Sequence, residues 1–227
     1  FQLSLLNAAN RTYGVQLSPL VNVSRHLQGV QIGSMGNMAT GSMKGVQLSA
    51  VNNMAGDVRG GLQLSALTNV STGCMRGMQL GAYNYADSLR GLQLGLVNIA
   101  VSHPRGVQVG LINYTRDADM RKVGLINIDP NTRIDVLAFG GNTSKLNTAL
   151  RFRHRSTYSM VALGTHYMGL DRKFSGALSY RLGQYVNLSP RWSLSADLGY
   201  SHIETFQEHS DDKPRRLYSL QGHLNVD

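Results

Sequence analysis

The first 128 residues repeat one unit of about fifteen residues, and this period limits the possible folds more than any other feature of the chain. Residues 91–105 show the unit most clearly, as the segment GLQLGLVNIA followed by a polar return that ends in Pro104-Arg105. Glutamine recurs at positions 2, 16, 31, 47, 63, 79, 93 and 108, and asparagine at 7, 22, 37, 53, 69, 84, 98, 113 and 127. A unit this short cannot bury its apolar side chains alone, so successive units must stack on one another.

Within each unit, apolar and polar residues alternate as they do in a β-strand. Val46, Leu48 and Ala50 alternate with Gln47 and Ser49, a period of two that favours a short, half-buried strand over a helix. A second apolar segment follows each asparagine and leads into a polar turn. Two short strands and two turns per unit predict one coil of a β-solenoid, and residues 1–128 predict about nine coils stacked at roughly 4.8 Å. We expect the apolar columns of these coils to lie inside.

Two further features of the unit support stacking. Asparagine or glutamine side chains at one position of successive coils can form hydrogen-bonded ladders, which favours a single polar residue type at that position. Glycine recurs where the chain must turn sharply, because a positive φ costs glycine little. These glycines are Gly14, Gly29, Gly45, Gly61, Gly77, Gly91 and Gly106.

The composition is typical of a β-rich repeat or a membrane β-barrel rather than of a soluble α/β enzyme. The 227 residues include 25 glycines, and only 15% are charged. No apolar run reaches the length of about eighteen residues that a transmembrane helix requires. The chain begins inside a repeat at Phe1 and stops inside an alternating pattern at Asp227, so we expect it to be part of a longer protein. The one cysteine, Cys74, is expected to be structural.

A basic residue stands just before the repeat glycine, or one place earlier, in most units. These residues are Lys44, Arg59, Arg76, Arg90 and Arg105, with Arg121 or Lys122 following in phase. Stacked coils would align them as a basic stripe that meets lipopolysaccharide phosphates, an acidic glycan or an acidic protein partner. The alternative, which the sequence favours, is a solvated column that protects exposed β-structure from aggregation. We do not expect nucleic acid as a partner, because no aromatic residues alternate with the stripe as stacking platforms.

The repeat ends near residue 129, and residues 129–227 follow a different pattern. Six longer segments with strand character lie at about 133–140, 146–155, 158–170, 174–186, 192–206 and 216–226. In the fifth, Trp192, Leu194, Ala196, Leu198 and Tyr200 share one face, and small or polar residues share the other. From Trp192 to Tyr200 an extended strand spans about 27 Å, close to the height of the apolar band of an outer-membrane barrel. This region is therefore predicted to be an antiparallel sheet or part of an outer-membrane β-barrel.

The fourth segment repeats this division, and the polar faces of the segments carry charges. Its apolar face carries Phe174, Leu178, Tyr180, Leu182 and Val186. The polar faces carry Arg151, Arg153 and Arg155 in the second segment, Arg181 in the fourth and Asp197 in the fifth. In a barrel these charges would pair in the lumen, which is the favoured interpretation, or form an anion-binding or anion-conducting lumen. Bacterial barrels begin at about eight strands, so either further strands exist or the region is a soluble sheet.

The segments GLQLGLVNIA and GVQVGLINYT, followed by KVGLINI and alternating strands such as YSMVALGTHYMGL and WSLSADLGYSHIETF, resemble the surface-repeat proteins of Gram-negative bacteria, especially Bacteroidetes. The resemblance covers most of the chain. It implies an exported protein that is associated with the outer membrane at the cell surface and has no enzymatic role. Early units depart from the pattern, since Ser18, Ser49 and Ser65 stand where later units have Gly81, Gly95, Gly110 and Gly124.

No arrangement of residues predicts catalysis, and we expect neither a cofactor nor a metal. Two functions remain. The first is a structural, adhesion or complex-scaffolding component of the outer membrane, in contact with membrane lipid and with a protein partner or an acidic surface glycan. The second is an outer-membrane pore or transport component with an arginine-lined lumen, in which the repeat strands would join a larger barrel. Repeat strands of about five or six residues are shorter than the roughly 9–11 residues that cross a membrane, which favours the first function.

Overall fold

The computed structural model describes residues 1–102, 105–117, 119–140, 145–154, 156–165, 173–189, 192–207 and 215–226. The chain divides into two compact units, Phe1–Pro130 and Asn131–Asp227, and each is described by itself. Strands make up most of the described residues, which contain no helix, and the prediction of an all-β fold is confirmed. None of the described residues belongs to a helix that is long and apolar enough to cross a membrane.

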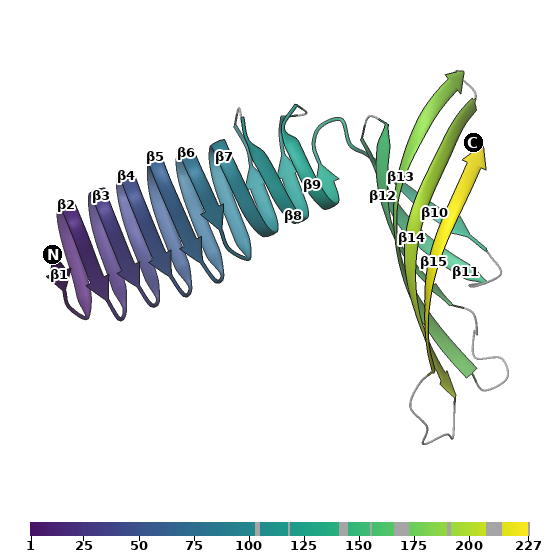
Figure 1. Cartoon of the computed structure of the whole chain (residues 1–227), viewed down its shortest axis with the longest axis horizontal. Helices are drawn as coiled ribbons and strands as arrows, with labels where there is room; N and C mark the ends of the chain where they lie inside the picture. The colour runs from purple at the N-terminus through teal and green to yellow at the C-terminus, as the bar shows by residue number, and fades with distance from the viewer. Residues whose placement is uncertain are drawn as a thin grey trace. The chain divides into compact units, whose positions relative to one another are not determined.

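The first unit is a parallel β-solenoid, as the fifteen-residue period predicts, with about eight turns where about nine coils were expected (Figure 1). Its nine strands lie in sequence order, and each pairs in parallel with the next one along the chain. They are β1 (Gln2–Leu3), β2 (Leu6–Ser18), β3 (Val21–Gly33), β4 (Gly36–Ser49), β5 (Asn52–Ser65), β6 (Thr68–Leu80), β7 (Tyr83–Ala100), β8 (Val107–Thr115) and β9 (Arg121–Ile128).

Equivalent positions of successive repeats lie directly beside one another in the solenoid. The register pairs Asn22 with Asn37 and Gln31 with Gln47, so each strand is offset from its neighbour by one repeat. Each coil therefore has two flat faces, which we call the Gln face and the Asn face. A short turn, such as residues 19–20, joins the glutamine segment to the next asparagine segment. Each strand itself bends at a longer turn, such as residues 24–29 within β3, so one continuous strand per unit takes the place of the two short strands expected. The short turns lie along the lower side of the solenoid in Figure 1, and the longer turns arch over its upper side.

The inward side chains on both faces are polar, which corrects the expected orientation of the glutamine strands. Gln47 is fully buried and Ser49 is buried, whereas Leu48 is 38% exposed. Val46 is half-buried and Ala50 is exposed. The same alternation holds along the column, because the repeat glutamines Gln16, Gln31, Gln47, Gln63, Gln79, Gln93 and Gln108 are all fully buried. The valine and leucine columns next to the glutamines were expected inside, and they face outward.

Two hydrogen-bonded ladders allow this polar interior. In the asparagine ladder, Nδ2 donates to Oδ1 of the next coil at 2.8–3.0 Å, from Asn7 through to Asn127. In the glutamine ladder, Nε2 donates to Oε1 of the preceding coil at 2.6–2.9 Å, from Gln108 back to Gln2. The second amide proton reaches a backbone carbonyl, as from Asn53 to Leu64 at 2.7 Å. Buried amides that are satisfied in this way cost little, and the predicted ladders are confirmed.

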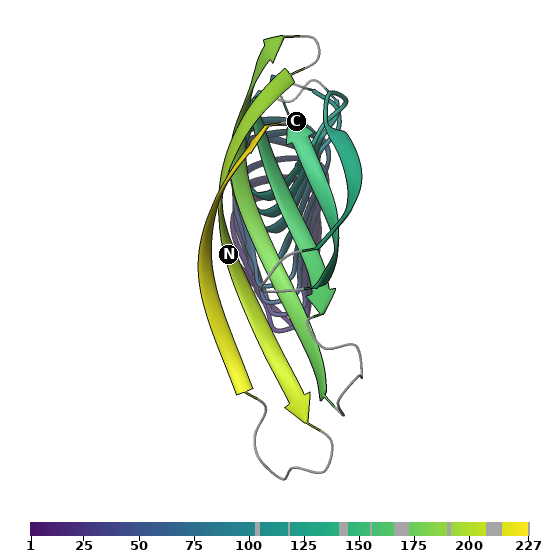
Figure 2. The same cartoon turned by 90° about the vertical axis from the view of Figure 1, so that its right-hand side faces the viewer.

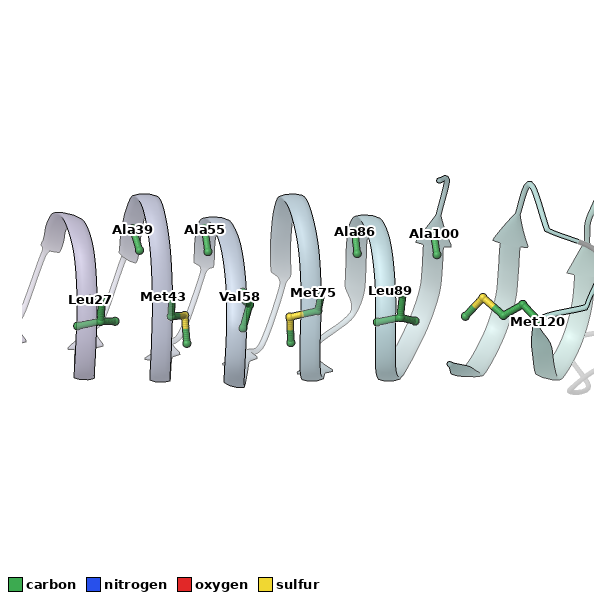
Figure 3. Packing of buried hydrophobic residues seen from close by; sticks show 10 residues of the cluster. All are labelled: Leu27, Ala39, Met43, Ala55, Val58, Met75, Ala86, Leu89, Ala100 and Met120. Carbon is green, nitrogen blue, oxygen red and sulfur yellow. The ribbon is translucent and has the colours of Figure 1, made fainter. Parts of the chain in front are cut away.

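The apolar core of the solenoid is a narrow strip close to the longer turns (Figure 3). One row consists of larger side chains, and a second row consists of alanines. The first row is Leu27, Met43, Val58, Met75 and Leu89, and the second is Ala39, Ala55, Ala86 and Ala100. Both rows are almost completely buried, so apolar columns do lie inside, but only in this strip.

A column of closely stacked glycines closes the longer turns. Gly45 and Gly77 each have a φ of 136°. A Cβ placed on Gly61 would lie 2.0 Å from the carbonyl oxygen of Gly45, which is far inside van der Waals contact. Glycine recurs at this turn because neither the backbone conformation nor the space between coils accepts a side chain.

The second unit is one antiparallel sheet of six strands, as the sequence predicts. The strands lie in sequence order and are β10 (Arg133–Phe139), β11 (Leu146–His154), β12 (Thr157–Thr165), β13 (Lys173–Ser189), β14 (Trp192–Gln207) and β15 (Arg215–Val226). The long strands are twisted and curved (Figure 2). Residues that pair directly across antiparallel strands point to the same side, so the register defines one polar and one apolar face of this sheet.

Candidate functional site

Every charged residue among the first 117 lies on the longer turns of the solenoid. The described residues of these turns are 9–14, 24–29, 39–45, 55–61, 71–77, 86–91, 100–102, 105–106, 115–117 and 119–121, and we call them the basic edge. They carry Arg11, Arg25, Lys44, Arg59, Arg76, Arg90, Arg105 and Arg116 against Asp57, Asp87 and Asp117, a net charge of +5 up to residue 117.

The residues of the expected basic stripe are all exposed, and five of the six precede a turn glycine on the basic edge by one or two positions. Arg76 pairs in register with Arg90, whereas Arg59 lies in a bulge of its strand. The sixth, Arg121, pairs with Val107 and lies one position beyond the glycine column. The residue before it is Met120, which takes the place of the turn glycine, so the last repeat moves Arg121 out of the stripe. Lys44 and Arg105 complete the set.

Most outward side chains of both faces are apolar, and they are half-buried or exposed; Asn52 and Thr68 on the Asn face are polar. On the Gln face they flank each glutamine, as Val15, Leu17, Val30, Ile32, Val46, Leu48, Leu62, Leu64, Met78, Leu80, Leu92, Leu94, Val107 and Val109. On the Asn face they flank each asparagine, as Val21, Val23, Met38, Met54, Val70, Tyr83, Tyr85, Val97, Ile99, Ile112 and Tyr114. Outer faces this apolar differ from those of a protein surrounded by water on every side.

The short turns form an uncharged edge opposite the basic edge, and we call it the apolar edge. It comprises residues 19–20, 34–35, 50–51, 66–67, 81–82, 95–96, 110–111 and 124–125. Leu67 is 52% exposed and Leu96 is 55% exposed, although both are large apolar side chains. An open groove of about 590 Å³ lies beside this edge, along Leu3, Leu17 and Ile32 on the Gln face.

The polar face of the second unit gathers the expected lumen residues that the structure describes. One row across the strands contains Arg153, Tyr158, Gly183 and Asp197, and the next row contains Arg151, Met160 and Arg181. The remaining candidate, Arg155, lies outside the described residues. Arg151 and Arg153 of β11 thus share a face with Asp197 of β14, as expected from the sequence.

Asp135 on β10 is the centre of an ion-pair cluster on this polar face. Its Oδ2 lies 2.6 Å from Nε of Arg153 and 3.3 Å from Nε of Arg151. Its Oδ1 lies 3.1 Å from Nε of Arg133, which is largely exposed and therefore adds little. The sequence did not single out Asp135, although its position in strand β10 puts it opposite Arg151.

Tyr158 forms a second contact that the sequence did not predict. Its hydroxyl donates to Oδ2 of Asp197 at 2.6 Å. Its ring covers Gly183, where a Cβ would meet the ring carbons at 2.3–2.5 Å. Tyr158 packs over Gly183 because the two residues pair directly on neighbouring strands. The sequence shows this pairing only when the register of the two strands is known.

The opposite face of the second unit is apolar in its middle part, where half-buried and exposed side chains lie on all six strands. Toward one end it carries charges, with Nε of Arg216 3.0 Å from Oε1 of Glu204. One row in register consists of Val136, Leu150, Val161, Tyr180, Tyr200 and Leu220. Leu198 is 78% exposed and Leu220 is 87% exposed. The predicted division of the fourth and fifth segments into two faces is confirmed for the described side chains, which do not include those of Trp192 and Phe174.

A buried ion pair closes the glutamine column of the solenoid. Lys122 stands in register with Gln108, and its Nζ lies 2.7 Å from Oδ2 of Asp129. Both side chains are almost completely buried. The lysine lies in phase with the glutamines in the sequence, whereas no spacing in the sequence indicates Asp129 as its partner.

Within the described ranges, no three histidine, cysteine, aspartate or glutamate side chains are grouped so that they could hold a metal ion. No protein-family model, no curated protein and no solved structure matches this chain. The candidate sites therefore stand on their geometry, which consists of the basic edge, the apolar surfaces of the solenoid and the two unlike faces of the second sheet.

Proposed function

We propose that this protein is a non-enzymatic component of the outer membrane of a Gram-negative bacterium, in which the second unit contributes strands to a β-barrel wall. The solenoid then acts as a structural, adhesion or complex-scaffolding element at that membrane. The observation that carries the proposal is the pair of unlike faces of the second sheet.

The apolar face has the chemistry of a wall in contact with lipid. Leu198 and Leu220 are almost fully exposed on neighbouring strands, and the row from Val136 to Leu220 crosses the whole sheet without a charge. A barrel wall alternates apolar residues toward lipid with polar residues toward the lumen, and this sheet does the same. Water would leave such a face unfavourably exposed, because apolar surface stabilises a protein only when it leaves water.

Strand length agrees with the proposal for five of the six strands. Strands β11 to β15 have 9, 9, 17, 16 and 12 residues, against the roughly 9–11 that cross a membrane. β10 has 7 residues and is shorter. Six strands are fewer than the eight or so of the smallest bacterial barrels, so the wall would include strands beyond these six.

The contacts of the polar face support a structural lumen rather than a pore. Arg151 and Arg153 pair with Asp135, and the Tyr158 hydroxyl binds Asp197. Paired charges neutralise one another and fill the space beside the sheet. Among the described residues no specific contact favours the pore alternative, and Arg151 and Arg153 already have the carboxylate of Asp135 as a partner.

The basic edge supports the binding part of the proposal. Lys44, Arg59, Arg76, Arg90 and Arg105 are exposed along one side of the solenoid. Such a row attracts an acidic protein partner or an acidic surface glycan.

Membrane extraction tests the proposal on the full-length protein in isolated outer membranes. We expect the protein to resist carbonate extraction and to migrate differently on a gel before and after heating. The variant Leu198→Arg places a charge at the middle of the apolar face and should weaken membrane folding by roughly 2–4 kcal/mol. The matched variant Ser156→Arg adds the same charge at an exposed turn and should change nothing. Release of the unchanged protein by carbonate would refute the membrane assignment.

A further inference from the structure

We propose that the solenoid lies within one leaflet of a membrane that contains anionic phospholipids, with its apolar edge among the acyl chains and its basic edge at the phosphates. The occupant of the two apolar faces is thus lipid. The inference is carried by residues of the first unit alone and does not rest on the function proposed for the second.

The first support is the complete separation of charge along the coil. From Gly91 to Ala100 the chain runs from the basic edge to the apolar edge and back without one charged residue. Each arm has about five residues and spans about 16 Å as extended strand. One leaflet of the hydrocarbon core is about 15 Å thick, so the uncharged part of a coil matches its depth.

The second support is the extent of the apolar surface. About eight turns at roughly 4.8 Å give a length of about 38 Å. Two faces of this length and about 16 Å depth amount to about 1,200 Å². The largest apolar patch of an ordinary soluble monomer is about 300–600 Å², so water is not the expected surroundings of these faces. The groove beside Leu3, Leu17 and Ile32 offers an apolar channel of the kind that an acyl chain fills.

The third support comes from the backbone of the apolar edge. In hydrocarbon every peptide group needs an internal partner, because water is absent. The turn amides at this edge donate to carbonyls of the preceding coil, as from Met35 to Leu20, Ala50 to Ser34, Ala66 to Ala50, Ala82 to Ala66 and Leu96 to Ala82, at 2.9–3.2 Å. A turn exposed to water would not need this pairing, but a turn in lipid does.

The basic edge supplies the charge complementarity. Eight basic and three acidic side chains lie along it up to residue 117, and the other outer surfaces of those residues carry none. A lysine or arginine near an anionic membrane surface strengthens attachment about fivefold. The basic edge therefore favours a surface that carries phosphates. The uncharged faces favour the acyl chains that lie beneath this surface.

Two labelled variants of one coil measure the depth of the solenoid directly. In the full-length protein, Cys74→Ser removes the native thiol, and a cysteine at Leu67 or at Thr72 then carries an environment-sensitive fluorophore. Leu67 lies on the apolar edge, Thr72 lies on the basic edge, and both are exposed. The protein is reconstituted in vesicles of phosphatidylcholine and phosphatidylglycerol that contain lipids with a quencher at a shallow or a deep acyl position.

We expect the label at position 67 to shift its emission to shorter wavelength and to be quenched most strongly by the deep lipid quencher. The label at position 72 should be quenched by the shallow quencher and by aqueous iodide. Quenching of both labels by iodide would overturn the inference. A label at position 67 that neither quencher reaches, in a protein that has doubled its mass, would also overturn it and assign the faces to a second copy of the chain.

A charge variant separates this inference from the function proposed for the second unit. Leu67→Asp with Leu96→Asp should lift the repeats out of the lipid, whereas the exposed basic-edge pair Thr40→Asp with Thr72→Asp adds the same charge and should leave them in place. Emission from a fluorophore at Val51→Cys, on the exposed apolar edge and in the Cys74→Ser background, reports the solenoid, and carbonate extraction reports the whole chain. In the protein without these added charges, loss of carbonate resistance with a lipid-quenched label at position 51 would count against the barrel wall only. Retained carbonate resistance of that same protein with the label in water would count against this inference only.

Discussion

Substitution of Gln47 and of its neighbour Leu48 tests whether the glutamine side chains point into the solenoid and the leucine side chains point out of it. Gln47 donates to Oε1 of Gln31 at 2.9 Å and to the Met54 carbonyl at 3.1 Å, and it accepts from Nε2 of Gln63 at 2.9 Å. Gln47→Ala therefore removes one hydrogen-bond partner from each of three buried groups. These are Oε1 of Gln31, the carbonyl oxygen of Met54 and Nε2 of Gln63. Each such group costs about 1–3 kcal/mol, so the expected loss of local stability is at least about 3 kcal/mol.

Leu48→Ala should have a much smaller effect. A fully buried leucine costs about 2–5 kcal/mol when truncated to alanine. Leu48 is 38% exposed and points away from the interior, so we expect less than about 1.5 kcal/mol. The variant Gln47→Met keeps most of the side-chain volume but removes the hydrogen bonds, and it should cost nearly as much as Gln47→Ala.

Hydrogen exchange measured by mass spectrometry on peptides from β4 and β5 gives the local free energy in the intact chain. A loss of about 3 kcal/mol corresponds to exchange roughly 150-fold faster for amides that exchange through opening of these coils. Each coil contacts only its neighbours, so the effect should fade within a few repeats. Faster exchange in Leu48→Ala than in Gln47→Ala would refute the polar interior.

Three further changes test other parts of the structure. Gly61→Ala forces a Cβ against the carbonyl of the preceding coil, so it should cost about 1–3 kcal/mol in the same exchange measurement, and unchanged exchange would contradict the close glycine stack. Tyr158→Phe removes the hydroxyl that binds the carboxylate of Asp197 and should lower stability to urea by about 1.5–3 kcal/mol; no change would show that this bond is not formed. Lys122→Met removes the cation that pairs with the buried carboxylate of Asp129 and should cost about 3–5 kcal/mol, most of which returns when Asp129→Leu is added; equal stability of the single and double variants would argue against the pair.

Much of the candidate site follows from spacing in the sequence. Residues one repeat apart must align when parallel coils stack. The repeat period alone therefore predicts that Lys44, Arg76 and Arg90 lie along one edge of the solenoid. Residues two apart in a strand share a side, which placed Arg151 and Arg153 together. The contacts of Asp135 and Tyr158 depend on how strands far apart in sequence are registered, and no local pattern states that register.

The sequence by itself determined the period, the β-structure, the ladders and the change of pattern near residue 129. The reason is that stacked repeats in parallel register place equivalent residues of successive repeats next to one another. Only the tertiary structure decided which side of each strand is inside. Alternation tells which residues share a side, and burial of the valine and leucine side chains looked favourable from the hydrophobic effect alone. Inside a coil of about fifteen residues, however, the amides of Gln47 and Asn53 find every partner they need from adjacent coils and from the backbone. The apolar side chains are therefore turned outward.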